Sequence, residues 1–280
     1  MINIASAIAF CALASLEAKF WAFRMIHYNK INYHEAQALS RIANGESPPS
    51  LKRAYDIFEP NFDCITKTRV GASYFGDGPK FMCDIEFIPP KHSAPGCLIY
   101  SIGSNGDFSF EAAVYNLFGC EIHTFDPTDT TGAWASKGTK NHAIFHNIGL
   151  SGTKSEIKVH NEKRELLPLN DIVKRLGHAN HHIDVLKVDC EGCEHKAFRP
   201  IWDDLMSNRY SIGQILIEIH GTNFTTIAPF FASAKEAGFL VYSKERNHWG
   251  CNGYSCVEYS LIHRSTARKS HRFLFDRLRA

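Results

Sequence analysis

Short apolar runs alternate with helical segments through the second half of the chain, and this alternation limits the folds that are open to it. Such a pattern predicts a parallel sheet with helices packed on both faces. The predicted strands are Leu98–Ile102, Cys120–Phe125, His142–His146, Ile183–Val188 and Gln214–Ile219, and the predicted helices are Phe110–Phe118, Leu169–Leu176 and Ile227–Ala237.

The last two apolar runs, Phe239–Ser243 and Cys256–Ile262, have too few helical residues between them for a parallel crossover. They should form an antiparallel hairpin at the sheet edge. The predicted fold class is therefore α/β: a Rossmann-like, mostly parallel sheet of seven strands with a C-terminal antiparallel hairpin and an N-terminal helical extension. Hydrophobic residues make up 44% of the chain and charged residues 21%, which argues against wholesale disorder.

Three regions follow from this pattern. Residues 1–59 are predicted as the helical extension, 60–263 as the main domain with a loop-rich start over 60–96, and 264–280 as a basic tail. The tail is either a solvated end or a binding segment for an acidic partner. The formal net charge of the whole chain is only +2, which makes a nucleic-acid partner an unfavourable hypothesis.

Residues 1–24 resemble a targeting segment in some respects. Ile4–Leu16 has the length of a signal-peptide apolar region, and Ala12–Ala14 resembles a cleavage site. Against this, no Lys or Arg precedes the apolar stretch, and Glu17 and Lys19 interrupt it before the roughly 20 residues of a membrane span. A signal, a membrane anchor and a packed helix all stay open.

The nine cysteines leave the compartment open. Cys190 and Cys193 form a single C-x-x-C, a weak indication of metal or redox chemistry. Reduced, buried cysteines of a cytosolic enzyme are one interpretation. In a secreted chain, four others become disulfide candidates: Cys64, Cys83, Cys97 and Cys120. Between the cytoplasm and the secretory pathway, we favour the secretory pathway or a membrane-anchored form.

Polar residues and glycines follow four of the predicted strands, where open α/β sheets bind ligands. Gly103 and Gly106 allow a tight turn and a close approach of the backbone to a ligand. A carboxylate at Asp126 can accept both hydroxyls of a ribose. Each feature alone also has an ordinary structural explanation. The glycines can simply form a turn, Asp126 can begin a turn with the proline that follows it, and Glu194 can lie on the surface of a helix. Their order and spacing together are more specific.

These motifs resemble the methyltransferase-like family related to FkbM methyltransferases, which are class I enzymes that use S-adenosylmethionine. The resemblance covers roughly residues 60–263. It is carried by Ile99–Glu111, Gly119–Thr128, His146–Ser151, Ile183–Glu194 and Gln214–His220, with Arg69–Gly71 and Asp77–Cys83 upstream. Pro79 stands where the family usually has a second glycine.

The resemblance implies a role for each matching residue. Gly103 and Gly106 would lie against the methionine part of the cofactor, and Asp126 would hold its ribose. The full predicted cofactor set is Ser101, Gly103, Asn105, Gly106, Asp126, Asn147 and Ile148, of which the last two would border the adenine. The predicted catalytic residues that line the methyl-transfer site are Asp189, Glu191 and His220.

The predicted function is O-methylation of an unidentified acceptor by S-adenosylmethionine, with one of the three catalytic residues as the base. The acceptor class that we expect is a small molecule or a glycan. Those three residues could also bind a metal, but no spacing requires one and none is predicted. Two alternatives stay open: an NAD(P)-dependent oxidoreductase, although Gly103-x-x-Gly106 lacks the G-x-G-x-x-G pattern, and a non-catalytic Rossmann-like binding module.

Overall fold

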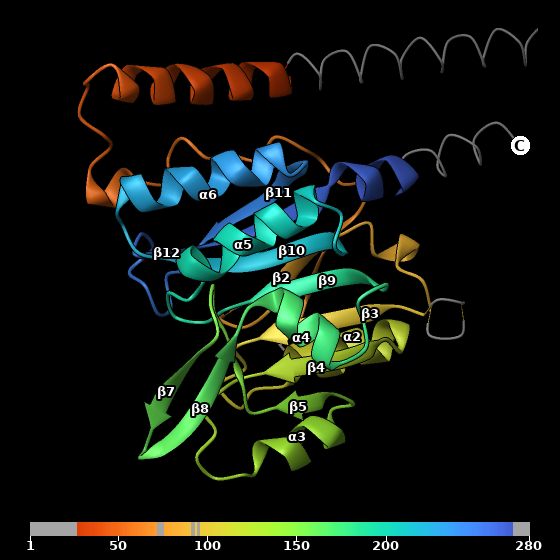
Figure 1. The fold of residues 1–280 in the computed structure, drawn as a ribbon. Helices are drawn as coiled ribbons and strands as arrows, with labels where there is room; N and C mark the ends of the chain where they lie inside the picture. Colours follow the sequence, from red (N-terminus) through yellow and green to blue (C-terminus); the bar gives the residue numbers. More distant parts are fainter. Residues whose placement is uncertain (1–26, 72–75, 91–92, 94–95, 271–280) are drawn as a thin grey trace, which may run out of the picture.

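The computed structural model describes residues 27–71, 76–90, 93 and 96–270 (Figure 1). The strands of its largest sheet are β3 (Leu98–Ile102), β4 (Glu121–Phe125), β5 (Ile144–His146), β9 (His182–Val188), β10 (Ser211–His220), β11 (Phe239–Arg246) and β12 (Cys256–His263). The helices that cover it are α2 (Ser109–Phe118), α3 (Trp134–Lys140), α4 (Leu169–Arg175), α5 (Glu194–Met206) and α6 (Phe224–Glu236).

The seven strands lie in the order β11-β12-β10-β9-β3-β4-β5. The strands from β10 to β5 pair in parallel, and β12 is antiparallel to both of its neighbours. The predicted Rossmann-like α/β fold with a C-terminal antiparallel hairpin is therefore confirmed. Of the two hairpin strands, β12 lies between β10 and β11, so β11 forms the edge of the sheet.

Two apolar cores cover the two faces of the sheet. Every residue of β3 is buried, as expected of a parallel strand that needs cover on both sides. One core cluster contains Ile172 of α4, Phe198 of α5 and Phe230 of α6. The other contains Val114 of α2 and Met82 of β2 (Lys80–Cys83).

Two small sheets were not predicted, and neither were the helices α3 and α5. In the region read as loop-rich, β1 (Lys67–Val70) pairs antiparallel with β2. A three-stranded sheet is formed by β6 (Gly149–Leu150), β7 (Ser155–Val159) and β8 (Glu162–Leu167), and Figure 1 shows its β7–β8 ribbon projecting from the body. The ribbon is mostly exposed and rich in charge, so it lacks the apolar alternation that identifies a half-buried strand. There are also two short 3-10 helices, Leu51–Arg53 and Ile85–Phe87.

Both flanking regions contain a helix. Residues 27–43 are helical, in line with the predicted extension, and Leu39 and Ile42 pack against the first core cluster. Residues 264–270 are helical too: Ala267 packs in the second cluster, whereas Arg264, Arg268 and Lys269 are exposed to solvent. The predicted signal or anchor at 1–24 and the end of the tail lie outside the described residues. Within the described ranges, no helix has the length and apolar character to cross a bilayer.

Four disulfides join cysteines of the described residues. Two of them use the four cysteines predicted as candidates, as Cys64–Cys83 and Cys97–Cys120. The C-x-x-C motif closes on itself as Cys190–Cys193, and Cys251–Cys256 closes the connection between β11 and β12.

Candidate functional site

Strand register brings the carboxyl ends of the central strands to one edge of the sheet. Ile102 of β3 lies opposite both Phe125 of β4 and Val188 of β9, and Val188 lies opposite Ile217 of β10. The residues that come next on these four strands therefore meet at the edge where such sheets bind ligands: Gly103, Asp126, Asp189 and Glu218.

The glycines of the β3–α2 loop serve close packing within the protein. Gly103 has a φ of 78°, which suits glycine, and a Cβ there would lie 1.7 Å from the carbonyl oxygen of Asp189. At Gly106 a Cβ would lie 2.8 Å from the ring of Trp134. Each glycine therefore makes room for a neighbouring segment. The predicted approach of a ligand to Gly103 and Gly106 stays a prediction.

Asp126 holds the same loop through hydrogen bonds. Its Oδ2 accepts from the backbone N–H of Ser104 and of Asn105, each at 2.9 Å. Its Oδ1 accepts from the N–H of Thr128 at 2.9 Å and from the Thr128 hydroxyl at 2.6 Å. Because these bonds occupy the acceptor sites of the carboxylate, a ribose hydroxyl at Asp126 would share an oxygen with the loop.

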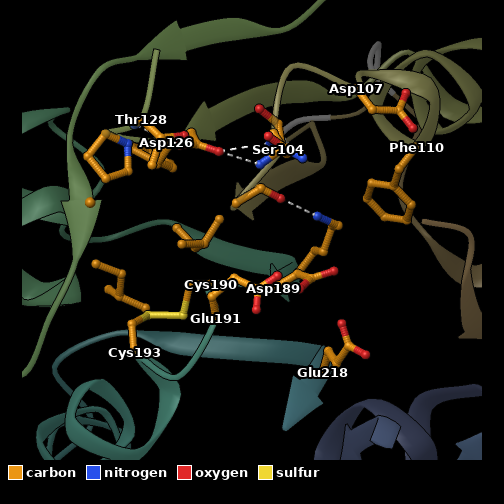
Figure 2. Close-up of a pocket in the computed structure, with 18 of the residues that line it drawn as sticks. Ser104, Asp107, Phe110, Asp126, Thr128, Asp189, Cys190, Glu191, Cys193 and Glu218 are labelled. Atoms are coloured by element: carbon orange, nitrogen blue, oxygen red, sulfur yellow. Dashed lines mark hydrogen bonds between the residues drawn. A yellow bond between two sulfur atoms is a disulfide. The ribbon is translucent and has the colours of Figure 1, made fainter. Parts of the chain in front are cut away.

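A cavity of about 660 Å³ opens beside these residues (Figure 2). Its apolar lining comes from Pro127 and from the small three-stranded sheet, through Leu150, Ile157 and Leu166. Its polar lining is dominated by carboxylates: Asp77, Asp107, Glu111, Asp126, Asp189, Glu191 and Glu218. Lys187 is the lysine among the described lining residues, and its Nζ donates to the carbonyl oxygen of Gly103 at 2.6 Å. The cavity therefore combines an apolar wall with an acidic one.

One of these carboxylates is incompletely bonded. Glu111 is 1% exposed, and its Oε1 accepts from the hydroxyl of Thr124 at 3.3 Å. Its Oε2 has no hydrogen-bond partner among the described residues. A buried carboxylate oxygen without a donor is costly, so its place beside the cavity suits a ligand that brings a positive charge or an N–H group.

The predicted site residues divide into two groups. Gly103, Asn105, Asp126, Asp189 and Glu191 line the cavity, whereas Ser101, Gly106, Asn147, Ile148 and His220 are absent from its lining. Ser101 is fully buried within β3, and Asn147 donates to the carbonyl oxygen of Asp129 at 3.1 Å. Ile148 packs against the first core cluster. The next residue, Gly149, lines the cavity, whereas Asn147 and Ile148 do not. The cofactor and catalytic roles of all these residues stay predictions.

Lys80 is a buried cation that pairs with Asp189 of the cavity lining and with Glu258. Its Nζ is 3.1 Å from Asp189 Oδ2 and also contacts Glu258 Oε1. Burial opposes the charge of Lys80, but Glu258 and Asp189 outweigh it and raise the pKa of Lys80. Burial likewise opposes the charge of Asp189, but Lys80 and Lys187 outweigh it and lower the pKa of Asp189 to about 2. Asp189 is therefore an anion throughout the physiological pH range.

Glu218 behaves in the opposite way. It lies opposite Glu258 in the β10–β12 pair and is 3% exposed. Burial raises the pKa of Glu218 to about 8, and the charges of Glu258 and Asp189 add to the rise. Its Oε1 accepts from Asn247 Nδ2 at 2.8 Å. Glu218 thus exchanges a proton near neutral pH on the wall of the cavity, as a general acid or base must.

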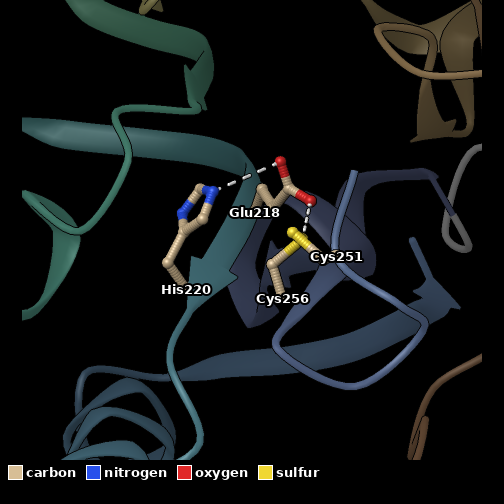
Figure 3. A group of neighbouring side chains, drawn as sticks. All are labelled: Glu218, His220, Cys251 and Cys256. Carbon is tan, nitrogen blue, oxygen red and sulfur yellow. Dashed lines mark hydrogen bonds and ion pairs between the residues drawn. A yellow bond between two sulfur atoms is a disulfide. The ribbon is translucent and has the colours of Figure 1, made fainter. Parts of the chain in front are cut away.

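His220 lies two residues further along β10, and Figure 3 shows the carboxylate of Glu218 between it and the Cys251–Cys256 disulfide. The Nδ1 of His220 is 3.1 Å from Glu194 Oε1, and its Nε2 is 3.3 Å from Glu191 Oε2. Burial opposes a charge on the ring, but the hydrogen bond to Glu194 and the surrounding carboxylates outweigh it and raise the pKa of His220 to about 9. At neutral pH the ring is already protonated, so it is suited to hold an ion pair rather than to accept a proton.

The residues predicted for the site did not include Lys80, Glu218 or Glu258. Glu218 carried a usable signal, because it is a lone charge within the apolar run Gln214–Ile219. Lys80 and Glu258 carried none. Their meeting depends on β2 packing against β10 and β12, which no local pattern reveals.

Comparison with known proteins gives a family and more distant relatives. A family model described as a methyltransferase domain matches residues 15–263. A human protein described as "Probable methyltransferase-like protein 24" is 33% identical over 131 residues, which is 44% of this chain and 32% of that protein. Its rat counterpart is 32% identical over 129 residues, 44% of this chain and 33% of that protein. The chain thus spans about a third of the length of the curated relatives that it matches.

Among solved structures, the fibrillarin pre-rRNA processing protein of Methanococcus jannaschii is 10% identical, with a TM-score of 0.39 over 60% of this chain and 66% of that one. The 1,6-didemethyltoxoflavin-N1-methyltransferase of Burkholderia thailandensis, solved with S-adenosylhomocysteine, is 11% identical, with a TM-score of 0.35 over 64% of this chain and 76% of that one.

Proposed function

The chain belongs to the methyltransferase-domain family, and on that premise we propose that it transfers a methyl group from S-adenosylmethionine to a hydroxyl oxygen. The acceptor that we propose is a small molecule or a glycan. The observation that carries the proposal is the acidic cavity at the carboxyl edge of the sheet. A closer kinship with FkbM methyltransferases, which the motifs indicate, is part of the same proposal.

The cavity fits the proposed donor. S-adenosylmethionine carries a positive sulfonium and a positive ammonium, and the carboxylates of the lining attract both. The Oε2 of Glu111, which has no hydrogen-bond partner in the described part of the chain, supplies one acceptor for such a group. A nicotinamide dinucleotide would instead bring a negative pyrophosphate against this wall, which disfavours the oxidoreductase alternative. The same repulsion disfavours a nucleic-acid backbone as the acceptor.

Different residues of the chain would bind different parts of the donor. The apolar side chains Pro127, Leu150, Ile157 and Leu166 suit the adenine ring, near the predicted pair Asn147 and Ile148. Asp126 lies beside them and would accept hydrogen bonds from the ribose while it holds the β3–α2 loop. The carboxylates beyond the loop then face the methionine part and the acceptor.

The reaction needs alignment and one proton acceptor. When bound, the donor supplies an electrophilic methyl group on a good leaving group, so the chain's main task is to place the acceptor oxygen in line. Glu218 would take the proton of the acceptor hydroxyl as that oxygen gains the methyl group and the sulfonium releases it. A carboxyl with a pKa of about 8 is better matched to this step than Asp189 at about 2. Asp189 remains a fixed anion, and His220 pairs with Glu191, which lines the cavity.

Titration calorimetry with S-adenosylmethionine, NAD⁺ and NADP⁺ tests the donor, and transfer of labelled methyl groups to hydroxyl-bearing metabolites and glycans tests the reaction. We expect binding of S-adenosylmethionine alone, followed by turnover with one acceptor class. Binding without turnover on any acceptor would support the non-catalytic module. Binding of a nicotinamide dinucleotide in preference to S-adenosylmethionine would overturn the proposal.

We also propose that the protein resides in the secretory pathway, free or membrane-anchored. Four disulfides support this, because such bonds are rare in the reducing cytosol. Thiol alkylation without reductant, followed by mass spectrometry of the protein taken from its own cells, should leave all eight of these cysteines unlabelled. Labelling of both members of any pair would contradict the proposed compartment.

A further inference from the structure

A second polar cluster lies on β4, outside the cavity lining. Glu121 and His123 share one face of this strand, and His178 reaches them from the connection between α4 and β9. Both histidines direct Nε2 at the same carboxylate oxygen, Glu121 Oε1: His123 at 2.8 Å and His178 at 3.3 Å. The three potential ligand atoms lie within 4.8 Å of one another.

The second nitrogen of each ring is also engaged. His123 Nδ1 is 2.8 Å from His146 Nε2, and His178 Nδ1 is 2.8 Å from the hydroxyl of Tyr100. Histidines that bind a metal through one ring nitrogen generally use the other to hold a partner, which fixes the ring and its tautomer. His123 and His178 are only 5% and 7% exposed, so both rings are held in place.

We propose that Glu121, His123 and His178 bind a Zn²⁺ ion. Two imidazoles and a carboxylate are ligands that zinc favours, and tetrahedral zinc needs one more, which water can supply. The Glu121 side chain is 54% exposed, so the cluster is open to solvent on that side. The group in Figure 3 is a weaker candidate, because its cysteines Cys251 and Cys256 are joined in a disulfide and offer no thiolate.

The bound ion joins β4 to the segment after α4 and, through His146, reaches β5. Two of its ligands, Glu121 and His123, lie on β4, the strand that precedes Asp126, and none of the three ligands lines the cavity. A ligand that binds only the folded chain stabilises it by mass action. Zinc should therefore raise the melting temperature of the full chain whether or not the methyl-transfer proposal holds.

The experiment uses the full chain stripped of metal with a chelator and then titrated with Zn²⁺, with Co²⁺ as a spectroscopic probe. We expect one zinc per chain by mass spectrometry after desalting, a higher melting temperature, and the visible absorption of four-coordinate Co²⁺. Glu121→Gln removes an exposed ligand with little risk to folding and should abolish stoichiometric binding.

A matched pair of variants tests the geometry. Tyr100→Phe removes the partner of His178 and should weaken zinc binding by roughly 10–100-fold. Tyr242→Phe removes a buried hydroxyl that bonds to Gln214 and Phe81 outside the cluster, and should leave the zinc affinity unchanged. Substoichiometric zinc in the unmodified chain would overturn the proposal. So would binding that survives Glu121→Gln but is lost in Glu191→Gln, which would assign the ion to the group of Asp189, Glu191 and His220.

Discussion

Asp126→Ala removes the carboxylate that accepts hydrogen bonds from the backbone N–H groups of Ser104, Asn105 and Thr128. The same carboxylate is the proposed acceptor for the ribose hydroxyls. Hydrogen bonds to a charged group contribute about 1.5–3 kcal/mol, so we expect S-adenosylmethionine to bind roughly 10–100-fold more weakly. The freed loop should also lower the melting temperature. Calorimetry and thermal unfolding check both effects, with Asp203→Ala on the exposed surface as the control. Unchanged affinity in a folded Asp126→Ala protein would remove the ribose assignment.

Glu218→Gln tests the proposed base. We expect turnover to fall by roughly 10²–10⁴-fold while the affinity for S-adenosylmethionine changes little. The pH dependence gives a second readout. Because the base must be deprotonated and the pKa of Glu218 is about 8, turnover of the unmodified protein should rise as pH increases through 8. The glutamine variant should lose that rise, and the exposed Glu236→Gln should keep it. A rise that persists in Glu218→Gln would assign the titration to another group.

At the scale of elements, His220 joins the end of β10 to the start of α5 through Glu194. The folded-state pKa of His220, about 9, lies above its ordinary value of 6.5. The ion pair therefore adds its full stability below pH 6.5 and loses it as pH rises through 9. Urea unfolding should show His220→Asn less stable than the unmodified chain by up to about 3 kcal/mol at pH 6, with the gap closing at pH 10. A gap that does not depend on pH would mean that the ring is neutral.

Two other elements, the β3–α2 loop and the β9–α5 loop, touch at Gly103. An alanine there would place its Cβ 1.7 Å from the Asp189 carbonyl oxygen at a φ of 78°. Gly177 has nearly the same φ, 77°, with open space around it. Gly177→Ala should thus lower the free energy of unfolding by only about 1–2 kcal/mol, because alanine disfavours the left-handed conformation. Gly103→Ala should lower it further, because its Cβ also clashes with the backbone. Urea unfolding should rank Gly103→Ala as clearly less stable. Equal losses would mean that the two loops can separate freely.

At the scale of the whole molecule, Cys97–Cys120 joins the residues that precede β3 and β4. Its members are 23 positions apart, and those of Cys251–Cys256 only 5. A longer closed loop restricts the unfolded chain more, so replacing both cysteines of the first pair by serine should cost about 2–4 kcal/mol. The second pair should cost less. Unfolding in urea measures both, and the reverse order would show that native contacts, rather than loop length, govern the stabilisation.

The sequence determined the elements of the central sheet because its signals are local. Leu98–Ile102 and Ile183–Val188 are apolar runs that must be covered on both faces, which makes them inner parallel strands. A glycine or a carboxylate directly after such a strand lies at its carboxyl end in any parallel sheet. For that reason the amino-acid sequence alone was enough to place Gly103, Asp126 and Asp189 at the site edge.

Only the tertiary structure decided which groups act on one another at that edge. The pairing of Glu218 with Glu258 depends on the register of β12 against β10, and the charge of Lys80 reaches them because β2 packs across both strands. These contacts join positions far apart in the chain, so no periodicity records them. Gly103 shows the same limit. The sequence predicted the turn, but it did not reveal that the carbonyl oxygen of Asp189 leaves no room for a side chain there, because that contact forms only when the two loops pack together.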